Sequence, residues 1–108
     1  MNYNATIVLI DKETPFFCKE VMELIKNIDQ LKSVHEAAKI VGVSSAKAWK
    51  MIRGVERALG EPAVRKQRIG ADPYKIHISP ACRGLLEKYA EFEAKSQEAV
   101  SNIYKQIF

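Results

Sequence analysis

Residues 33–57, SVHEAAKIVGVSSAKAWKMIRGVER, contain two short helical patterns separated by a glycine, and this segment constrains the fold more than any other. Ser33 and Glu36 have the spacing of a capping box, in which the serine oxygen accepts from the Glu36 N–H and the carboxylate reaches back. Gly42 ends the first helix, because glycine adopts the left-handed conformation of a helix end without strain. Ser44 then caps a second helix. Two helices joined by so tight a turn predict a helix-turn-helix.

The second helix, expected over residues 44–59, has two faces of opposite character. Successive helical residues are about 100° apart, which places one narrow apolar stripe toward the core: Ala48, Ile52, Val55 and Leu59. The opposite face carries Ala46, Lys50, Arg53 and Arg57, with Lys47 on one flank. In the first helix, the small side chains of Ala37 and Ala38 allow the crossing helix to come close.

The positive charge of the chain is concentrated in and just after this second helix. The whole chain has a net charge of +4, yet Ser44 to Lys75 holds eight basic and three acidic residues, a local net of +5. Residues 1–43 hold five basic and six acidic residues, and residues 76–108 hold four of each. Such a distribution is typical of nucleic-acid binding. A basic face that is merely solvated is the alternative interpretation.

Short elements are expected on both sides of this segment. The apolar run Ala5 to Ile10 predicts a strand, and Thr14 with Pro15 predicts the start of a helix that ends near residues 27–30. After the second helix, residues 64–67 and 74–78 predict two strands joined by the turn-rich residues 69–73. A hairpin in this place is a wing, and its basic side chains would lie against phosphate.

From Pro80 onward the sequence predicts one long helix. Its apolar positions follow alternating steps of four and three residues, at Leu85, Tyr89, Phe92, Ser96, Ala99 and Ile103. Because a domain of 108 residues has little further core to offer them, we expect helix-to-helix contact in a homodimer. A helix that folds back onto its own domain is the alternative.

These elements predict a mainly α (α+β) fold: a winged helix-turn-helix with an N-terminal strand, a two-stranded wing and a long C-terminal dimerisation helix. We expect residues 1–79 to form the DNA-binding domain and residues 80–108 to form the dimerisation helix. The candidate DNA-binding residues are Ser44, Ser45, Ala46, Lys47, Lys50, Arg53, Arg65, Lys66, Arg68 and Lys75. Arginine and lysine can donate to the guanine edge in the major groove, whereas wing cations would contribute affinity and salt dependence.

The run AAKIVGVSSAKAWKMIRGVERALGEPAVRKQ, residues 37–67, resembles the N-terminal DNA-binding domain of ModE-type molybdate-responsive regulators. It is also similar to the winged helix of LysR-type regulators. The matching features are the alanine pair, Gly-Val-Ser at the turn, Ala48-Trp49, and Leu59-Gly60-x-Pro62 before a basic strand; the likeness extends more loosely to Tyr89. The resemblance implies a winged helix, a homodimer and a role in transcriptional regulation.

The sequence departs from the ModE pattern in three ways. ModE-type wings are glycine-rich, whereas this one reads Ile69-Gly70-Ala71-Asp72-Pro73-Tyr74. Ile78-Ser79-Pro80-Ala81-Cys82 stands where the family has Leu-Thr-x-x-Gly. The molybdate-binding domain that follows in full-length ModE proteins is not in this sequence. We therefore expect a stand-alone DNA-binding domain without molybdate binding.

Other function classes have less support. A winged helix used only for protein–protein assembly remains the alternative function. The sequence has no glycine-rich phosphate loop and no nucleophile motif, so we expect neither an enzyme nor a cofactor. Cys18 and Cys82 lie far apart, and so do His35 and His77, which fits neither a metal site nor a disulfide framework. No apolar run has membrane-spanning length, and we expect a cytoplasmic protein. From the helix-turn-helix and its basic charge we expect its partner to be double-stranded DNA.

Overall fold

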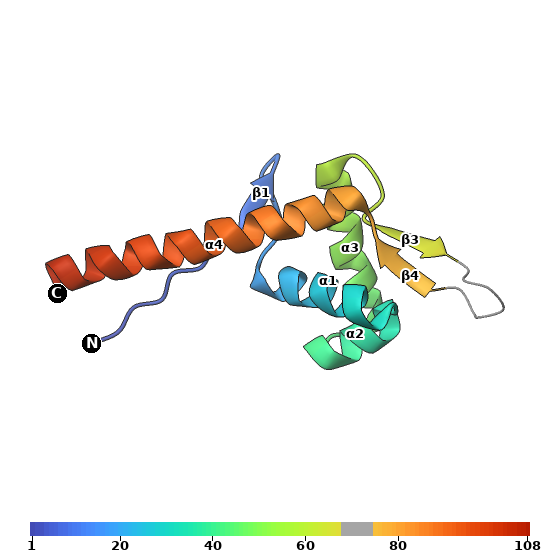
Figure 1. Ribbon diagram of the computed structural model, residues 1–108, viewed down its shortest axis with the longest axis horizontal. Helices are drawn as coiled ribbons and strands as arrows, with labels where there is room; N and C mark the ends of the chain where they lie inside the picture. The colour runs from blue at the N-terminus through green and yellow to red at the C-terminus, as the bar shows by residue number, and fades with distance from the viewer. Residues whose placement is uncertain (68–74) are drawn as a thin grey trace.

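The computed structural model describes residues 1–67 and 75–108. Their elements, in chain order, are β1 (Leu9–Asp11), β2 (Thr14–Phe17), α1 (Lys19–Leu31), α2 (Val34–Val41), α3 (Ser45–Leu59), β3 (Val64–Gln67), β4 (Lys75–Ile78) and α4 (Pro80–Ile107). The first three helices pack together, β3 and β4 project from one end, and α4 extends far beyond the other (Figure 1). The molecule is elongated, with extents of 60 × 28 × 22 Å. This is the expected winged helix-turn-helix.

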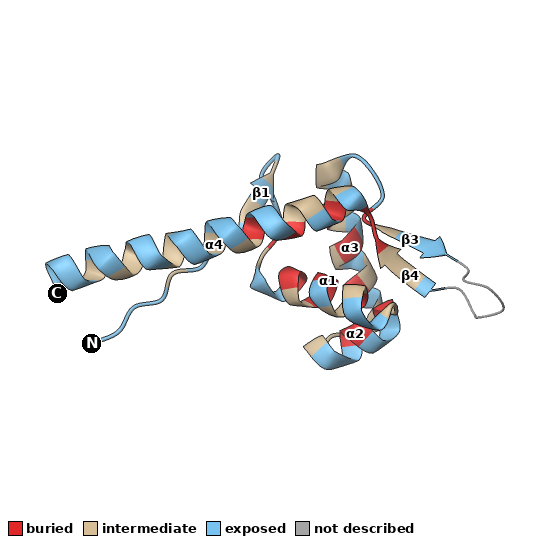
Figure 2. Cartoon of the chain, in the orientation of Figure 1, coloured by how far each residue is buried: buried red, intermediate tan, exposed pale blue. Residues whose placement is uncertain are grey.

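The helix-turn-helix forms as its local signals predict. The Ser33 hydroxyl accepts from the Glu36 N–H at 3.1 Å, and the Ser44 hydroxyl accepts from the Lys47 N–H at 3.1 Å. Gly42 has a φ of 85° and Gly60 has a φ of 73°, so both close their helices in the left-handed region. The facing surfaces of α2 and α3 meet in the core through small or branched side chains (Figure 2): Ala37, Ala38, Ala48, Ile52 and Val55 are buried.

The N-terminus differs from the sequence-based expectation. Residues 14–17 form a strand and not the start of a helix, while the predicted strand over residues 5–10 is ordered as β only from Leu9. The cause is a tight turn: Lys12 and Glu13 have φ values of 47° and 72°, which lets β1 and β2 pair as an antiparallel hairpin. Two consecutive left-handed residues suit the twist of a two-residue hairpin loop. Helix α1 therefore begins at Lys19, and Cys18 is its N-cap.

The wing is held to the body of the domain by backbone hydrogen bonds. Strands β3 and β4 are antiparallel, with Val64 opposite Ile78 and Gln67 opposite Lys75. The N–H of Ile76 donates to the carbonyl of Lys32 at the end of α1, at 3.0 Å. At the base of the wing, the Ser79 N–H donates to the Ala63 carbonyl at 2.8 Å. The expected Tyr74 end of the second strand lies outside the described residues.

Helix α4 belongs to the core at its beginning and leaves it further on. Cys82, Leu86 and Tyr89 are buried, and burial raises the pKa of the Cys82 thiol to about 11. Both cysteines are free thiols: Cys82 is in the core, whereas Cys18 is half-buried. No α4 residue beyond Tyr89 is buried (Figure 2). None of the helices in the described part of the chain has both the length and the apolar character needed to cross a bilayer.

Residues 1–8, here called the N-terminal arm, run in an extended conformation beside the distal half of α4 (Figure 1). Three α4 side chains donate to carbonyl oxygens of the arm: Tyr89 to Ile7 at 2.8 Å, Gln97 to Ala5 at 2.6 Å and Tyr104 to Met1 at 2.8 Å. The ring of Tyr3 also lies 4.6 Å from that of Tyr104, measured between centroids. The arm therefore covers one face of α4.

Candidate nucleic-acid interface

The outward face of α3 carries cations above a buried stripe. Lys50, Arg53 and Arg57 are exposed, whereas Ala48, Ile52 and Val55 are at most 1% exposed on the opposite side of the same helix. Within the described residues, none of these three cations forms a salt bridge. Their charges are therefore available to an anion, as the helical spacing predicts.

The first turn of α3 contributes polar groups, several of which already have partners within the domain. Ser44 is exposed and caps the helix, so its structural role is confirmed, while phosphate contact stays a prediction. The Ser45 hydroxyl lies 2.9 Å from Nδ1 of His35, a contact that joins α2 to α3. Ala46 is exposed. Lys47 is also exposed, but its Nζ lies 3.5 Å from the Glu20 carboxylate of α1, an ion pair that solvent weakens.

Strand register divides the charged residues of the wing between two faces. Arg65 is opposite His77, and Lys66 is opposite Ile76. Because side chains alternate along a strand, Arg65 and Lys75 share one face of the hairpin, while Lys66 lies on the face of Ile76 and Ile78. All three cations are exposed. Arg68, also expected to bind DNA, lies outside the described residues.

His77 lies on β4, on the same face of the hairpin as Arg65. Its side chain is half-buried, and Nε2 is buried without a hydrogen-bond partner among the described residues. Trp49 is half-buried and packs against the core. Neither side chain adds a donor to the exposed face of α3.

Two further features position the interface and were not apparent in the sequence. An Asp29–Arg83 pair joins α1 to α4, with guanidinium nitrogens 2.8 Å and 3.1 Å from the two carboxylate oxygens. This hydrogen bonding holds the pKa of Asp29 below its usual 3.8. Glu56 of α3 accepts from the Ala63 N–H at 2.9 Å, which ties α3 to the start of the wing.

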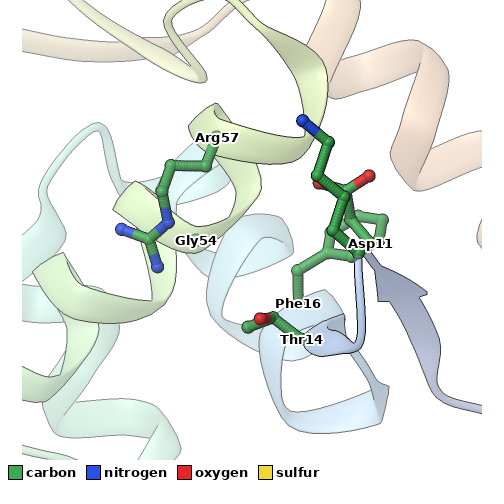
Figure 3. Close-up of a pocket in the computed structure, with 6 residues that line it drawn as sticks. Asp11, Thr14, Phe16, Gly54 and Arg57 are labelled. Carbon is green, nitrogen blue, oxygen red and sulfur yellow. The ribbon is translucent and has the colours of Figure 1, made fainter.

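The β1–β2 hairpin packs beside α3 and borders its basic face. Figure 3 shows Arg57 and Gly54 on α3 facing Asp11, Thr14 and Phe16 of the hairpin across a hollow of about 360 Å³. This neighbour was missed because a lysine–glutamate turn is not a recognised hairpin signal. Residues 7–17 read IVLIDKETPFF, in which two apolar runs flank a short polar segment, and this is the sequence signal that could have indicated a hairpin.

The residues expected in a dimer interface differ in exposure, and one of them packs in the core of its own chain. Leu85 and Ser96 are half-buried, Ala99 is exposed, Phe92 is 53% exposed and Ile103 is 54% exposed. Tyr89 contradicts the expectation, because it is only 2% exposed and its ring packs on Phe17 of the same chain, 4.8 Å between centroids. Its hydroxyl is bound to the arm. Tyr89 is therefore a core residue.

Comparison with known proteins supports the fold. No protein-family model matches the chain, and no curated protein matches it. Among solved structures, the chain is similar to Vibrio fischeri DarR, a protein of the LTTR (LysR-type) family solved in complex with DNA. The TM-score is 0.58 at 17% identity, over 81% of this chain and 28% of DarR. This confirms a winged helix like that of LysR-type regulators, and the chain spans less than a third of the DarR length.

No described group of three or more histidine, cysteine, aspartate or glutamate side chains is arranged to hold a metal ion.

Proposed function

We propose that this chain is a homodimeric DNA-binding transcriptional regulator. Helix α3 enters the major groove, which is wide enough to admit an α-helix, and the β3–β4 wing contacts the phosphate backbone. The observation that carries the proposal is the row of exposed cations on α3, directly opposite its buried stripe. Lys50 and Arg53 read bases, while Ser44 and Ser45 bind phosphate at the start of the helix. The protein acts in the cytoplasm as a binding protein and not as an enzyme.

Three observations support this assignment. The local net charge of +5 over residues 44–75 coincides with α3 and the wing. The similar DarR domain was solved with DNA. The alanine pair, the Gly-Val-Ser turn and Ala48-Trp49 resemble the recognition segment of ModE-type regulators, and we propose that α3 has the same role here.

The decisive test is binding to a library of duplexes at several salt concentrations. We expect selected duplexes to bind with an affinity that falls steeply as salt rises, because cations on the protein displace counterions from phosphate. The Lys50→Ala and Arg53→Ala double variant should bind all duplexes with similar affinity, since a good base contact discriminates by about 1–3 kcal/mol.

The matched control removes two lysines from α4, Lys88→Ala with Lys105→Ala, and so changes the net charge by the same amount. Both residues are exposed and belong to α4, not to α3 or the wing. This control should keep the ranking of duplexes. Equal binding to every duplex by the unaltered protein would contradict specific regulation. No DNA binding at low salt, together with a stoichiometric protein partner, would favour the assembly module.

The dimer is proposed from the part of α4 that the arm leaves uncovered. Phe92, Ala99 and Ile103 lie in one stripe at steps of seven and four residues and are all exposed, while Gln97 and Tyr104 bind the arm on a neighbouring face. A second copy of α4 would cover this stripe by coiled-coil packing. Such a dimer predicts DNA half-sites about one helical turn apart, or a multiple of it.

Sedimentation of a Phe92→Glu and Ile103→Glu double variant tests the dimer. Both side chains are more than half exposed in the single chain, so the fold should be retained while two buried charges per copy oppose association. We expect the unaltered protein to sediment as a dimer and the variant as a monomer. A Glu91→Lys and Lys95→Glu exchange, which reverses an exposed pair elsewhere on α4, should remain dimeric. A monomer at all concentrations of the unaltered protein would exclude this interface.

A further inference from the structure

A second and larger hollow lies between the β1–β2 hairpin, α1 and the side of α3. Its volume is about 630 Å³, within the range of small-molecule sites. Its walls are largely apolar, with Phe16 from β2, Val21 from α1 and Met51 from α3. It adjoins the hollow of Figure 3, with which it shares four lining residues: Thr14, Phe16, Gly54 and Arg57.

Gly54 leaves the α3 side of this hollow open. A Cβ placed on Gly54 would meet only one heavy atom within 4 Å, a guanidinium nitrogen of Arg57 at 3.8 Å. The glycine therefore relieves no clash, and its backbone lies within a regular helix where alanine would be more stable. What the missing side chain provides is space beside Arg57.

The charged side chains that line the hollow are all cations. Lys47, Lys50 and Arg57 line it, and none of the described lining residues is a carboxylate. Two acidic groups lie nearby: Glu20 pairs with Lys47 at 3.5 Å, and Asp11 lines the adjoining hollow. Lys50 and Arg57 have no salt-bridge partner among the described residues. An apolar cavity with two unpaired cations at its edge is complementary to an apolar molecule that carries one negative group.

We propose that this hollow binds a small amphipathic carboxylate. Its hydrocarbon or aromatic body lies against Phe16 and Met51, and its carboxylate accepts hydrogen bonds from Arg57 and Lys50. Arginine suits this role because its guanidinium can donate two parallel hydrogen bonds to one carboxylate. A neutral molecule of the same shape would leave both cations unpaired, and an amine would be repelled by them.

The consequence for regulation rests on the function proposed above. Lys50 is assigned both to DNA and to the carboxylate, and the bound ligand adds negative charge beside the recognition helix. The ligand and DNA therefore oppose each other's binding, and the reciprocity of linked equilibria requires the effect to be equal in both directions. This domain would thus sense a small carboxylate at the DNA-reading helix itself.

The test is titration of the whole chain with hydrocinnamate, its neutral amide and phenylpropylamine, by calorimetry and by nuclear magnetic resonance without DNA. We expect the carboxylate to bind at least about ten-fold more tightly than the amide, a difference of about 1.4 kcal/mol. Its amide shift changes should centre on Phe16, Met51 and Gly54. The amine should give no binding.

Two variants separate the site from general effects on the fold. Gly54→Leu fills the hollow and should abolish binding, whereas Gly84→Leu, at a helical glycine of α4 that also has open space around it, should leave binding unchanged. Arg57→Gln keeps the cavity and removes a charge. It should therefore lower the affinity for hydrocinnamate until it equals the affinity for the neutral amide. Circular dichroism checks that Gly54→Leu is folded, and Arg57→Gln remains informative if it is not.

The outcomes distinguish this inference from the proposed function. Absence of carboxylate binding up to millimolar concentration, equal binding of the amide, or full binding by folded Gly54→Leu would each overturn the site, whatever the protein does with DNA. Carboxylate binding that depends on Gly54 and Arg57 supports the site even if no duplex binds. Where both ligands bind, hydrocinnamate should reduce DNA affinity, and Gly54→Leu should abolish that reduction; independent binding would overturn the regulatory consequence.

Discussion

At the scale of single residues, the turn between α2 and α3 depends on the backbone of Gly42. Its φ of 85° lies in the left-handed region, which residues with a Cβ rarely adopt. Gly42→Ala should therefore lower the free energy of unfolding by about 1 kcal/mol, even though a Cβ there would meet no atom within 4 Å. Denaturant unfolding measures this change.

Gly84→Ala is the matched control for that substitution, because Gly84 lies inside α4 with open space around it. There alanine should raise the free energy of unfolding by about 0.5–1 kcal/mol, since glycine loses more backbone freedom in a helix. Opposite signs for the two substitutions would identify backbone conformation as the cause. A stabilising effect of Gly42→Ala would show that the left-handed turn is not what ends α2.

The Asp29–Arg83 pair makes a pH-dependent contribution to stability. Because Arg83 lowers the pKa of Asp29 below the usual 3.8 in the folded state, the ionised pair stabilises the fold above that pH. The contribution is lost as pH falls through the lowered folded value. Asp29→Asn should cost about 0.5–1 kcal/mol at neutral pH, a small effect because the Arg83 side chain is 49% exposed.

Unfolding measured at neutral pH and well below pH 3.8 checks this prediction, since the difference between Asp29→Asn and the unaltered protein should vanish in acid. Glu91→Gln is the control. Its partner Lys95 lies one turn away on the same helix and is 74% exposed, so its loss should change stability little at either pH. A difference for Asp29→Asn that persists in acid would show that shape, and not charge, accounts for the effect.

At the scale of elements, α3 and the wing should contribute to DNA binding in different ways. Lys66 lies on the two-stranded β3–β4 hairpin and not on α3, and phosphate contacts carry no sequence information. Lys66→Ala should weaken binding to all duplexes by a similar factor and reduce the magnitude of the salt slope by about 1. Affinity measured against salt concentration for two duplexes of different sequence tests this expectation. A change in the relative affinity for the two duplexes would indicate that Lys66 contacts bases and not phosphate.

At the scale of the whole molecule, the arm and α4 support each other over a long distance. Gln97 and Tyr104 donate to carbonyls of Ala5 and Met1, so removal of residues 1–6 leaves the distal half of α4 without these contacts. Hydrogen exchange should accelerate in residues 93–107, where no side chain is buried, and stay unchanged in α3. Unchanged protection of the distal helix would mean that other contacts order it.

Much of the helix-turn-helix could be predicted because its signals are local. Ser33 and Ser44 cap helices three residues from the N–H groups that they bind, and helical periodicity alone separates Ala48 and Ile52 from Lys50 and Arg53. Gly60 likewise ends α3 by its left-handed conformation, and β3 begins shortly after it at Val64. These signals act over a few residues, and the surrounding fold leaves them unchanged in this segment. The helix start predicted at Thr14 and Pro15 is also a local signal, but the turn at Lys12 and Glu13 places those residues in β2 instead.

What only the tertiary structure decided depends on residues far apart in the chain. Tyr89 belongs to the core because it meets the carbonyl of Ile7, 82 positions away, and Asp29 binds Arg83 across 54 positions. An apolar residue on a regular helix is equally suited to its own domain or to a second copy, and spacing cannot distinguish the two. The same holds for the hairpin that packs beside α3 and creates the hollow at Gly54: its position depends on which surfaces meet, which no local pattern encodes.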